Sequence, residues 1–288
     1  MEQLRCLVEE ELRTPVDTSV RTLAAAIAER HGAASRAVLF YGSCLRQKKL
    51  DGLMLDFYLI VSDYSAAYPK RWMSIANRLV PPNVFPFEKN GLAAKYAVLS
   101  EADFHRLCGP ATRNVSVWAR FAQPSRLAWS ADDQAEQMVM EAVEQAAPTL
   151  LAAAGTRDNE APLDRWRRAF ALTYSAELRA ERKVRAASVV DTDRERYKRF
   201  SAPAAVAAAS IPAAFSKGWR ARRVAGKATS VVRLAKASAT FAGGVDYIAW
   251  KINRHAGTDI QIKPWQRRWP LLAAISLLPR LLKSGAVR

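Results

Sequence analysis

The sequence predicts an α+β protein in which a small α/β unit comes first, a helical unit follows and a basic amphipathic helix ends the chain. Two short apolar runs, 37–41 and 54–61, have the length and the β-branched and aromatic content of buried strands. Helical periodicity replaces these runs after residue 130, and the basic residues gather later still. We therefore divide the chain into units 1–128, 129–245 and 246–288.

The first unit is expected to alternate helices and strands. Apolar residues at helical spacing, among them Val20, Leu23 and Ile27, predict a helix over 17–31 that ends before Gly32. The other expected elements are the two strands above, a loop at 63–69, a helix at 70–80, an irregular loop at 81–91, a strand at 95–99 and a helix at 101–108 that Ser100 caps.

The second unit is expected to be helical. A helix should run from Ser130 to about residue 154, and another should span 162–187, with Trp166 and Phe170 in the core. The region 201–245 is rich in Ala, Ser and basic residues, which predicts either loosely packed helices or a partly mobile segment.

Charge is distributed very unevenly along the 288 residues, whose formal net charge is +17. Residues 1–150 hold 17 Lys/Arg and 17 Asp/Glu, whereas from Tyr197 onward 17 basic residues face only Asp246 and Asp259. This asymmetry indicates that the C-terminal part meets a polyanion, either nucleic acid or an anionic membrane surface.

Cysteine and histidine usage excludes several kinds of site. The spacing fits neither a disulfide framework nor a zinc site nor a nucleophilic triad, and it suits a reducing compartment. The residues are Cys6, Cys44, Cys108, His31, His105 and His255. Each histidine is expected at the surface or at a helix cap. The acidic N-terminus lacks a secretory apolar segment, and no run reaches the roughly 18 apolar residues of a spanning helix. We expect a cytoplasmic protein, soluble or peripheral.

The most informative motif is Tyr41-Gly42-Ser43, followed by Asp56 on the next strand. A glycine lets the backbone approach a phosphate closely, and Ser43 offers a hydroxyl and an N–H as donors. A carboxylate on the neighbouring strand can hold the Mg²⁺ that bridges triphosphate oxygens. This layout is typical of nucleotidyltransferases. The alternative is that Gly42 simply ends a strand and Asp56 lies at a sheet edge.

The motif also has unusual features. Cys44 follows Ser43, so the turn must be made with a negative φ or under strain. Many nucleotidyltransferases carry a second acid two residues along the strand, on the same face, where this chain has Tyr58. Asp51 or Asp63 could supply the second metal ligand, and we favour Asp51 because it precedes the strand near the Gly-Ser turn.

The last segment, from Lys263, has the composition of an interfacial helix. Tryptophans beside arginines suit a lipid headgroup layer, and the leucine stripe is long enough to dip below that layer without crossing it. Each basic residue near an anionic leaflet contributes about 1 kcal/mol. The residues expected to bind the membrane include Trp265, Arg268, Trp269, Leu272 and Arg280. Alternatively, this helix docks on the protein's own core.

Islands of sequence along most of the chain resemble one known family. They are VLFYGSCLRQ, LMLDFYLIV with Asp63 after it, KYAVLS, WARFAQPSRL and FAGGVDYIAWKINRHAG. In this order they resemble the mitochondrial translocator assembly and maintenance family, whose members are CTP-dependent phosphatidate cytidylyltransferases. That family's first motif typically reads YGSG, so Cys44 departs from it.

The resemblance implies a function and a set of site residues. Gly42 and Ser43 would hold the triphosphate of CTP, Asp56 would be the essential metal-binding acid, and Lys95 would contact the nucleotide or a phosphate. The products would be CDP-diacylglycerol and pyrophosphate, made with Mg²⁺ by an enzyme bound peripherally to the inner face of the membrane. Phosphatidate, CTP and an anionic membrane surface are then the expected partners, and nucleic acid is not.

Two other functions remain open on the sequence. A nucleotidyltransferase acting on RNA or on a small soluble acceptor would use the same N-terminal motifs and would grip RNA with its basic half. A non-catalytic membrane-associated relative would keep the fold without activity, as the single strand carboxylate suggests.

Overall fold

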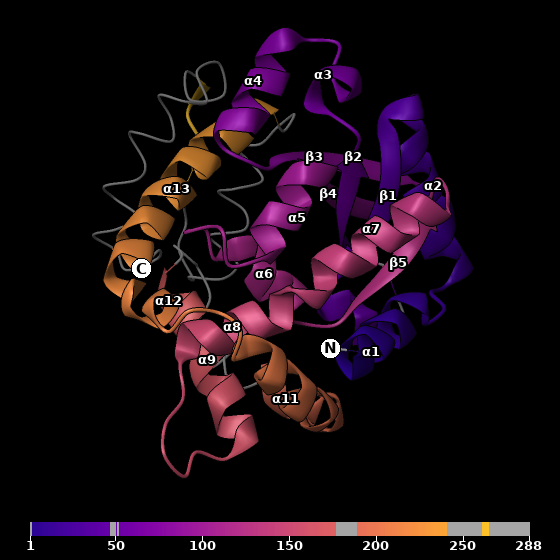
Figure 1. Cartoon of the computed structure of the whole chain (residues 1–288). Coiled ribbons are helices and arrows are strands. Elements are labelled where there is room, and N and C mark those ends of the chain that lie inside the picture. The colour runs from indigo at the N-terminus through magenta and orange to yellow at the C-terminus, as the bar shows by residue number, and fades with distance from the viewer. Residues whose placement is uncertain (1, 47–49, 51, 177–188, 241–260, 265–288) are drawn as a thin grey trace.

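One mixed five-stranded sheet forms the centre of the computed structural model, with helices against both of its faces (Figure 1). The structure describes residues 2–46, 50, 52–176, 189–240 and 261–264. The strands are β1 (Ser35–Tyr41), β2 (Met54–Val61), β3 (Asn83–Lys89), β4 (Leu92–Ser100) and β5 (Ser125–Ser130), in the order β3-β4-β2-β1-β5.

Strand pairing sets which residues meet at each end of the sheet. β2 runs parallel to β4 and places Asp56 opposite Lys95, whereas β1 runs antiparallel to β2 and places Tyr41 opposite Asp56. The last residue of β1 therefore lies beside the early part of β2, and β4 lies on the other side of β2. Gly42, which follows Tyr41, is thereby brought to the same end of the sheet.

The helices fall into two groups. The first comprises α1 (Glu2–Arg13), α2 (Thr18–Glu29), α3 (Tyr64–Ala67), α4 (Arg71–Leu79), α5 (Glu101–Cys108) and α6 (Ser116–Phe121). The second comprises α7 (Asp133–Glu144), α8 (Ala146–Ala154), α9 (Pro162–Ala176), α11 (Arg194–Ala208), α12 (Ala214–Lys217) and α13 (Trp219–Thr240). Two single 3-10 turns, η1 (Gly32–Ala34) and η2 (Ser43–Arg46), flank β1.

Successive side chains of each strand point to opposite faces of the sheet, so the core is divided into two apolar clusters. Phe57 and Leu59 of β2 pack with α2 on one face, while Tyr58 and Ile60 pack with α5 and α6 on the other. Asp56 has the same parity as Tyr58, so it belongs to the face that α5 and α6 cover. That face also continues into the helical part, because its cluster includes α8, α9 and α11 residues.

Several elements agree with the sequence predictions. β2 spans Met54–Val61, the range expected. α2 begins after Asp17, whose side chain accepts a hydrogen bond from Ser19 N, and α5 begins after Ser100, whose hydroxyl accepts from Asp103 N. The expected strand at 95–99 lies within β4. The structure therefore has the expected mixture of helices and strands, with the sheet formed by the first part of the sequence and a run of helices after it.

The segment 81–91 was expected to be an irregular loop, and this was wrong, because most of it forms β3. It pairs with β4 from Asn83 to Lys89 and stands at the edge of the sheet. Pro86 has no N–H to donate, which an edge strand tolerates. Turn residues Asn90 and Gly91, both at positive φ, then connect β3 to β4.

Other boundaries also differ from the predictions. The expected loop after Asp63 contains the one-turn helix α3, and the helix expected to begin at Ser130 and end near residue 154 is two helices that meet at Gln145. α1 and β5 were not predicted. β5 pairs with β1 through Ser130, so the sheet extends two residues beyond position 128.

Helices α8, α9 and α11 build the core of the later part. Trp166 and Phe170 are fully buried, as expected, and Tyr197 of α11 meets both in edge contacts. Of the expected helix 162–187, residues 177–187 lie outside the described residues, as do 246–260 and 265–288 of the C-terminal unit.

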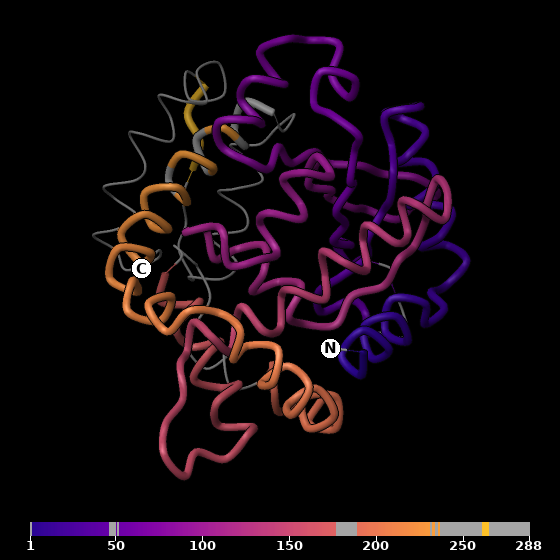
Figure 2. The backbone as a smooth tube through the Cα atoms, in the orientation of Figure 1, coloured from indigo at the N-terminus to yellow at the C-terminus, as the bar shows by residue number. Residues whose placement is uncertain are grey.

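Helix α13, although late in the sequence, lies beside the sheet that the first part of the chain forms. In Figure 2 it runs next to the segment that follows α4, and two of its side chains bond that segment's backbone: Arg233 Nε donates to Pro81 O and Lys236 Nζ to Val80 O. No helix in the described part of the chain has the length and apolar character needed to cross a bilayer.

Candidate active site

Gly42 makes the turn that leaves β1, and only glycine suits its position. Its φ is +94°, a conformation that L side chains rarely adopt. A Cβ on Gly42 would lie 3.2 Å from Asp56 Oδ2. The missing side chain therefore lets the backbone of the turn approach the carboxylate of the neighbouring strand.

The turn after Gly42 accommodates the unusual Cys44. Leu45 N donates to Gly42 O at 3.3 Å, which closes η2, and the positive-φ non-glycine residues of the described chain are Asn90 and Asn159. Cys44 thus keeps a negative φ, one of the two outcomes expected. Its buried thiol donates to Met54 O at 3.5 Å, and burial, with Asp56 nearby, raises its pKa. Ser43 stays exposed.

Asp56 and Lys95 form an ion pair across β2 and β4. Lys95 Nζ lies 3.1 Å from Asp56 Oδ1, and the two side chains are 24% and 23% exposed. Asp56 Oδ1 is buried. A carboxylate oxygen can accept more than one bond, so Asp56 keeps accepting capacity beside this ion pair.

The donor set suits a magnesium ion that arrives with a nucleotide. Mg²⁺ is usually held by one or two carboxylates together with substrate phosphates and waters, so a single Asp56 is compatible with it. In the described part of the chain, no group of three or more His, Cys, Asp or Glu side chains is placed to hold a metal ion. Asp51, the favoured second ligand, lies outside the described residues.

Asp63 has a structural role. Its side chain caps α3 by accepting from Ser65 N at 2.7 Å, and it pairs with Arg78 at 3.3 Å. It follows the far end of β2, seven positions along the chain from Asp56. Asp63 therefore acts as a helix cap.

Arg120 of α6 is a site residue that the sequence reasoning missed. Its guanidinium donates to Tyr58 Oη at 3.0 Å and lies over the Tyr41 ring, 5.4 Å from the centroid. Tyr41 precedes Gly42, and Tyr58 lies two residues after Asp56 on the same face of β2. Arg120 therefore belongs to the same end of the sheet as the Gly42 turn. The sequence signal was weak, because Arg120 stood in an island of resemblance without an assigned role.

His31 lies at a cap, one of the two places expected: it is the N-cap residue of η1, although its side chain makes no capping hydrogen bond. Its ring is half-buried among Tyr68, Phe85 and Tyr96. Nδ1 lies 3.0 Å from Ala67 O and Nε2 lies 3.1 Å from Tyr96 Oη. Burial lowers its pKa, which keeps the ring neutral at pH 7. The ring packs with the face opposite Asp56, so it is not part of this site.

The proposed membrane-binding residues cannot be placed. Trp265, Arg268, Trp269, Leu272 and Arg280 all lie outside the described residues. The structure therefore brings together Gly42, Asp56 and Lys95 of the predicted site, leaves Ser43 at its exposed edge, and adds Arg120 with the two tyrosines.

No protein-family model matches the chain, and no curated protein matches it. Among solved structures, the chain is similar to a crystal structure described as a nucleotidyltransferase-like protein from Exiguobacterium sibiricum 255-15. The match has 11% identity and a TM-score of 0.29, and covers 92% of this chain and 91% of that one.

Proposed function

We propose that the protein is a nucleotidyltransferase that transfers CMP from CTP to phosphatidate, giving CDP-diacylglycerol and pyrophosphate at a membrane surface. One observation supports the reaction type above all: the Gly42 turn, the Asp56 carboxylate and the Lys95 ammonium meet at one end of three adjacent strands. A carboxylate can hold the metal ion, and a cation and the accessible backbone of a turn can hold the phosphates of a nucleoside triphosphate.

The chemistry asks for positioning and charge neutralisation. The phosphate monoester of phosphatidate has a second pKa near ~6, so at neutral pH it is already an anionic nucleophile and needs no general base. One of its oxygens forms a bond to the α-phosphorus of CTP while the bond from that phosphorus to the β-phosphate oxygen breaks. Pyrophosphate leaves with the electron pair of the broken bond.

Residues of this chain have distinct roles in that reaction. The Ser43 hydroxyl and the backbone of the Gly42 turn hold the triphosphate, and Lys95 neutralises phosphate charge. Asp56 would hold Mg²⁺, with Asp51 as the proposed second ligand. When bound, the ion supplies further charge neutralisation at the phosphates. Arg120, anchored on the Tyr58 hydroxyl, adds a second cation.

The choice of CTP and phosphatidate rests on the sequence resemblance and on the basic, tryptophan-containing tail. An acceptor embedded in a membrane requires an enzyme that reaches the headgroup layer, which such a tail provides. The tail would keep the enzyme peripheral, at the inner face of the membrane.

The test is incubation of the full chain with CTP, Mg²⁺ and phosphatidate vesicles, comparing Asp56→Asn with Asp63→Asn. Asparagine also caps helices, so Asp63→Asn preserves the start of α3 and should keep full activity. Asp56→Asn should reduce CDP-diacylglycerol formation at least about 100-fold, as expected when a metal-binding carboxylate is lost. Equal product from Asp56→Asn and the unchanged protein would falsify the proposal.

The same preparation separates the other functions. Transfer of the nucleotidyl group to RNA, with no lipid product, would show that RNA and not phosphatidate is the acceptor. Nucleotide binding without any product would indicate a non-catalytic relative. Deleting 264–288 should abolish vesicle flotation but spare nucleotide binding. A truncated protein that still floats with vesicles would refute the role of the tail.

A further inference from the structure

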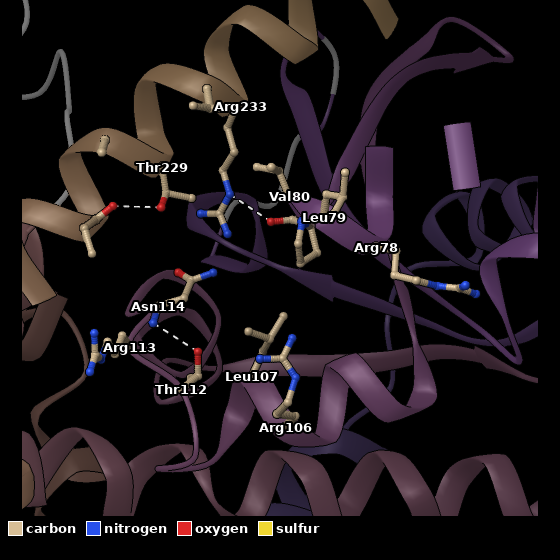
Figure 3. Close-up of a pocket in the computed structure, with 15 residues that line it drawn as sticks. Arg78, Leu79, Val80, Arg106, Leu107, Thr112, Arg113, Asn114, Thr229 and Arg233 are labelled. Atoms are coloured by element: carbon tan, nitrogen blue, oxygen red, sulfur yellow. Dashed lines mark hydrogen bonds between the residues drawn. The ribbon is translucent and has the colours of Figure 1, made fainter. Parts of the chain in front are cut away.

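A concave surface lies between α13 and the elements that follow α4 and α5. This cavity, which we call the α13 cavity, has a volume of about 410 Å³ (Figure 3). Helix α13 forms one wall with residues such as Thr229 and Arg233, and the 109–115 loop forms another with Arg113 and Asn114. None of the residues described around the Asp56 carboxylate lines it.

The lining of the α13 cavity is strongly basic. Four arginines line it, Arg78, Arg106, Arg113 and Arg233, and none of its described lining residues is acidic. Arg78 turns away from the cavity in Figure 3, toward Asp63, with which it pairs. Arg106 pairs with Asp103 at 2.6 Å. Arg233 and Asn114 point into the space between α13 and the loop in the same view.

Charges of the same sign are crowded around this wall. Burial and the neighbouring Arg233 lower the pKa of Lys236 on α13 to about 7. Burial and Arg113 likewise lower the pKa of Arg222, whose guanidinium is buried against the Phe215 ring. Each shift means that the local environment disfavours positive charge. A bound anion would relieve this repulsion. Two of the lining arginines have carboxylate partners, Arg78 with Asp63 and Arg106 with Asp103.

Apolar side chains stand next to the same cavity. Leu79 at the end of α4 and Val232 on α13 both line it and are 75% and 49% exposed. Ile75 and Trp72 continue an exposed stripe along α4 at helical spacing. A ligand at this position would therefore meet both cationic and exposed apolar side chains, a combination that suits an amphiphile.

We propose that the α13 cavity binds a phosphate group, carried either on the headgroup of an anionic phospholipid or on a small soluble molecule. Arg106, Arg113 and Arg233 would supply charge-assisted hydrogen bonds, with Asn114 and Thr229 as neutral donors. A volume of about 410 Å³ accommodates a phosphate with a glycerol-sized group attached. This site uses residues other than Gly42, Asp56 and Lys95, and its occupation does not depend on nucleotidyl transfer.

The test measures binding to the full chain with two kinds of probe. Inorganic phosphate and glycerol 3-phosphate are titrated by calorimetry, and phosphatidylcholine vesicles with or without phosphatidate are tested by flotation. Arg113→Gln is the first variant, because Arg113 is exposed and its loss should not disturb folding. Arg106→Gln combined with Arg113→Gln is the second. Arg21→Gln, on the far side of the sheet on α2, matches the loss of charge and serves as control.

Binding of one probe class should weaken about ten-fold in Arg113→Gln, the loss expected for one charge-assisted hydrogen bond, and further in the double variant. Arg21→Gln should bind normally. So should Asp56→Asn, which separates this site from the proposed active site. A response to soluble phosphates identifies the soluble source, and a response confined to phosphatidate vesicles identifies the lipid. Absence of binding to every probe, or a double variant that binds like the unchanged protein, would overturn the proposal.

Discussion

At the scale of single residues, the close approach of the Gly42 backbone to the Asp56 carboxylate decides the character of the candidate site. Gly42 is favoured for two reasons at once, a positive φ and a gap in which a Cβ would press against Asp56. The sequence indicated the glycine and the acid, because both residue types carry recognisable chemistry. It could not indicate Arg120, whose role comes from the packing of α6 against Tyr58 and Tyr41.

Gly42→Ala should be compared with Gly91→Ala. Both glycines have positive φ, but nothing lies within 4 Å of a Cβ on Gly91, whereas Asp56 Oδ2 would lie 3.2 Å from one on Gly42. Each variant should lose about 1–2 kcal/mol of unfolding free energy from backbone strain alone, measured by urea titration. Only Gly42→Ala should also weaken binding of CTP with Mg²⁺, by about ten-fold. Equal nucleotide affinities in the two variants would show that the narrow gap is irrelevant to the site.

Arg120→Gln should lower kcat/KM for CDP-diacylglycerol formation about 100-fold, the usual loss for removing one preorganised donor to a reacting phosphate. Arg120→Lys keeps the charge and should recover part of the rate. Tyr58→Phe removes only the hydroxyl that Arg120 contacts and should change the rate a few-fold at most. If Tyr58→Phe and Arg120→Gln lose activity equally, Arg120 acts only through its contact with Tyr58.

At the scale of elements, local signals succeeded where one segment determines its own conformation. The caps Asp17 and Ser100 mark the starts of α2 and α5 because their side chains bond the first turn directly. The prediction for β3 was wrong because three prolines and a glycine indicate a loop. The pairing partner that makes this segment a strand lies in β4. Edge pairing is a tertiary event that the segment's own composition does not encode.

Asn77 tests how α4 is fixed to the sheet edge. It is fully buried, its Nδ2 donates to Val98 O at 2.9 Å, and its Oδ1 accepts from Asn83 N. Asn77→Ala would leave two buried backbone groups unsatisfied and should cost about 2 kcal/mol of unfolding free energy. Ile75→Ala on the exposed side of α4 should stay within about 0.5 kcal/mol. Chemical denaturation measures both, and an Asn77→Ala variant as stable as Ile75→Ala would refute this anchoring role.

At the scale of the whole molecule, α1 and helices from the later part of the chain, such as α11, pack together on one side of the sheet. Arg196 of α11 donates to both carboxylate oxygens of Glu11 on α1 and, through Nη1 at 3.0 Å, to Ala122 O. These partners come from three distant parts of the chain. Neither α1 nor this buried pair was anticipated, since nothing within either segment reveals the other.

Glu11→Gln should destabilise the protein by about 3 kcal/mol, because Arg196 would remain as a buried, uncompensated charge. The side chains of Arg196 and Glu11 are only 8% and 10% exposed. The neighbouring pair Arg199–Glu10 joins the same two helices, but its side chains are 55% and 62% exposed. Glu10→Gln should therefore change the unfolding free energy by no more than about 0.5 kcal/mol. Thermal and urea unfolding check both values, and similar losses in both variants would contradict the distinction.

The sequence by itself determined the strand carrying Asp56, the glycine turn before it, the order of sheet and helices, and the concentration of positive charge late in the chain. These features depend on local periodicity and composition. Only the tertiary structure decided that Asp56 faces Lys95, that Arg120 contacts Tyr58 on the same strand as Asp56, and that α13 lines a basic cavity. Each of these depends on register and helix packing between residues far apart in sequence, and no local signal specifies such a juxtaposition.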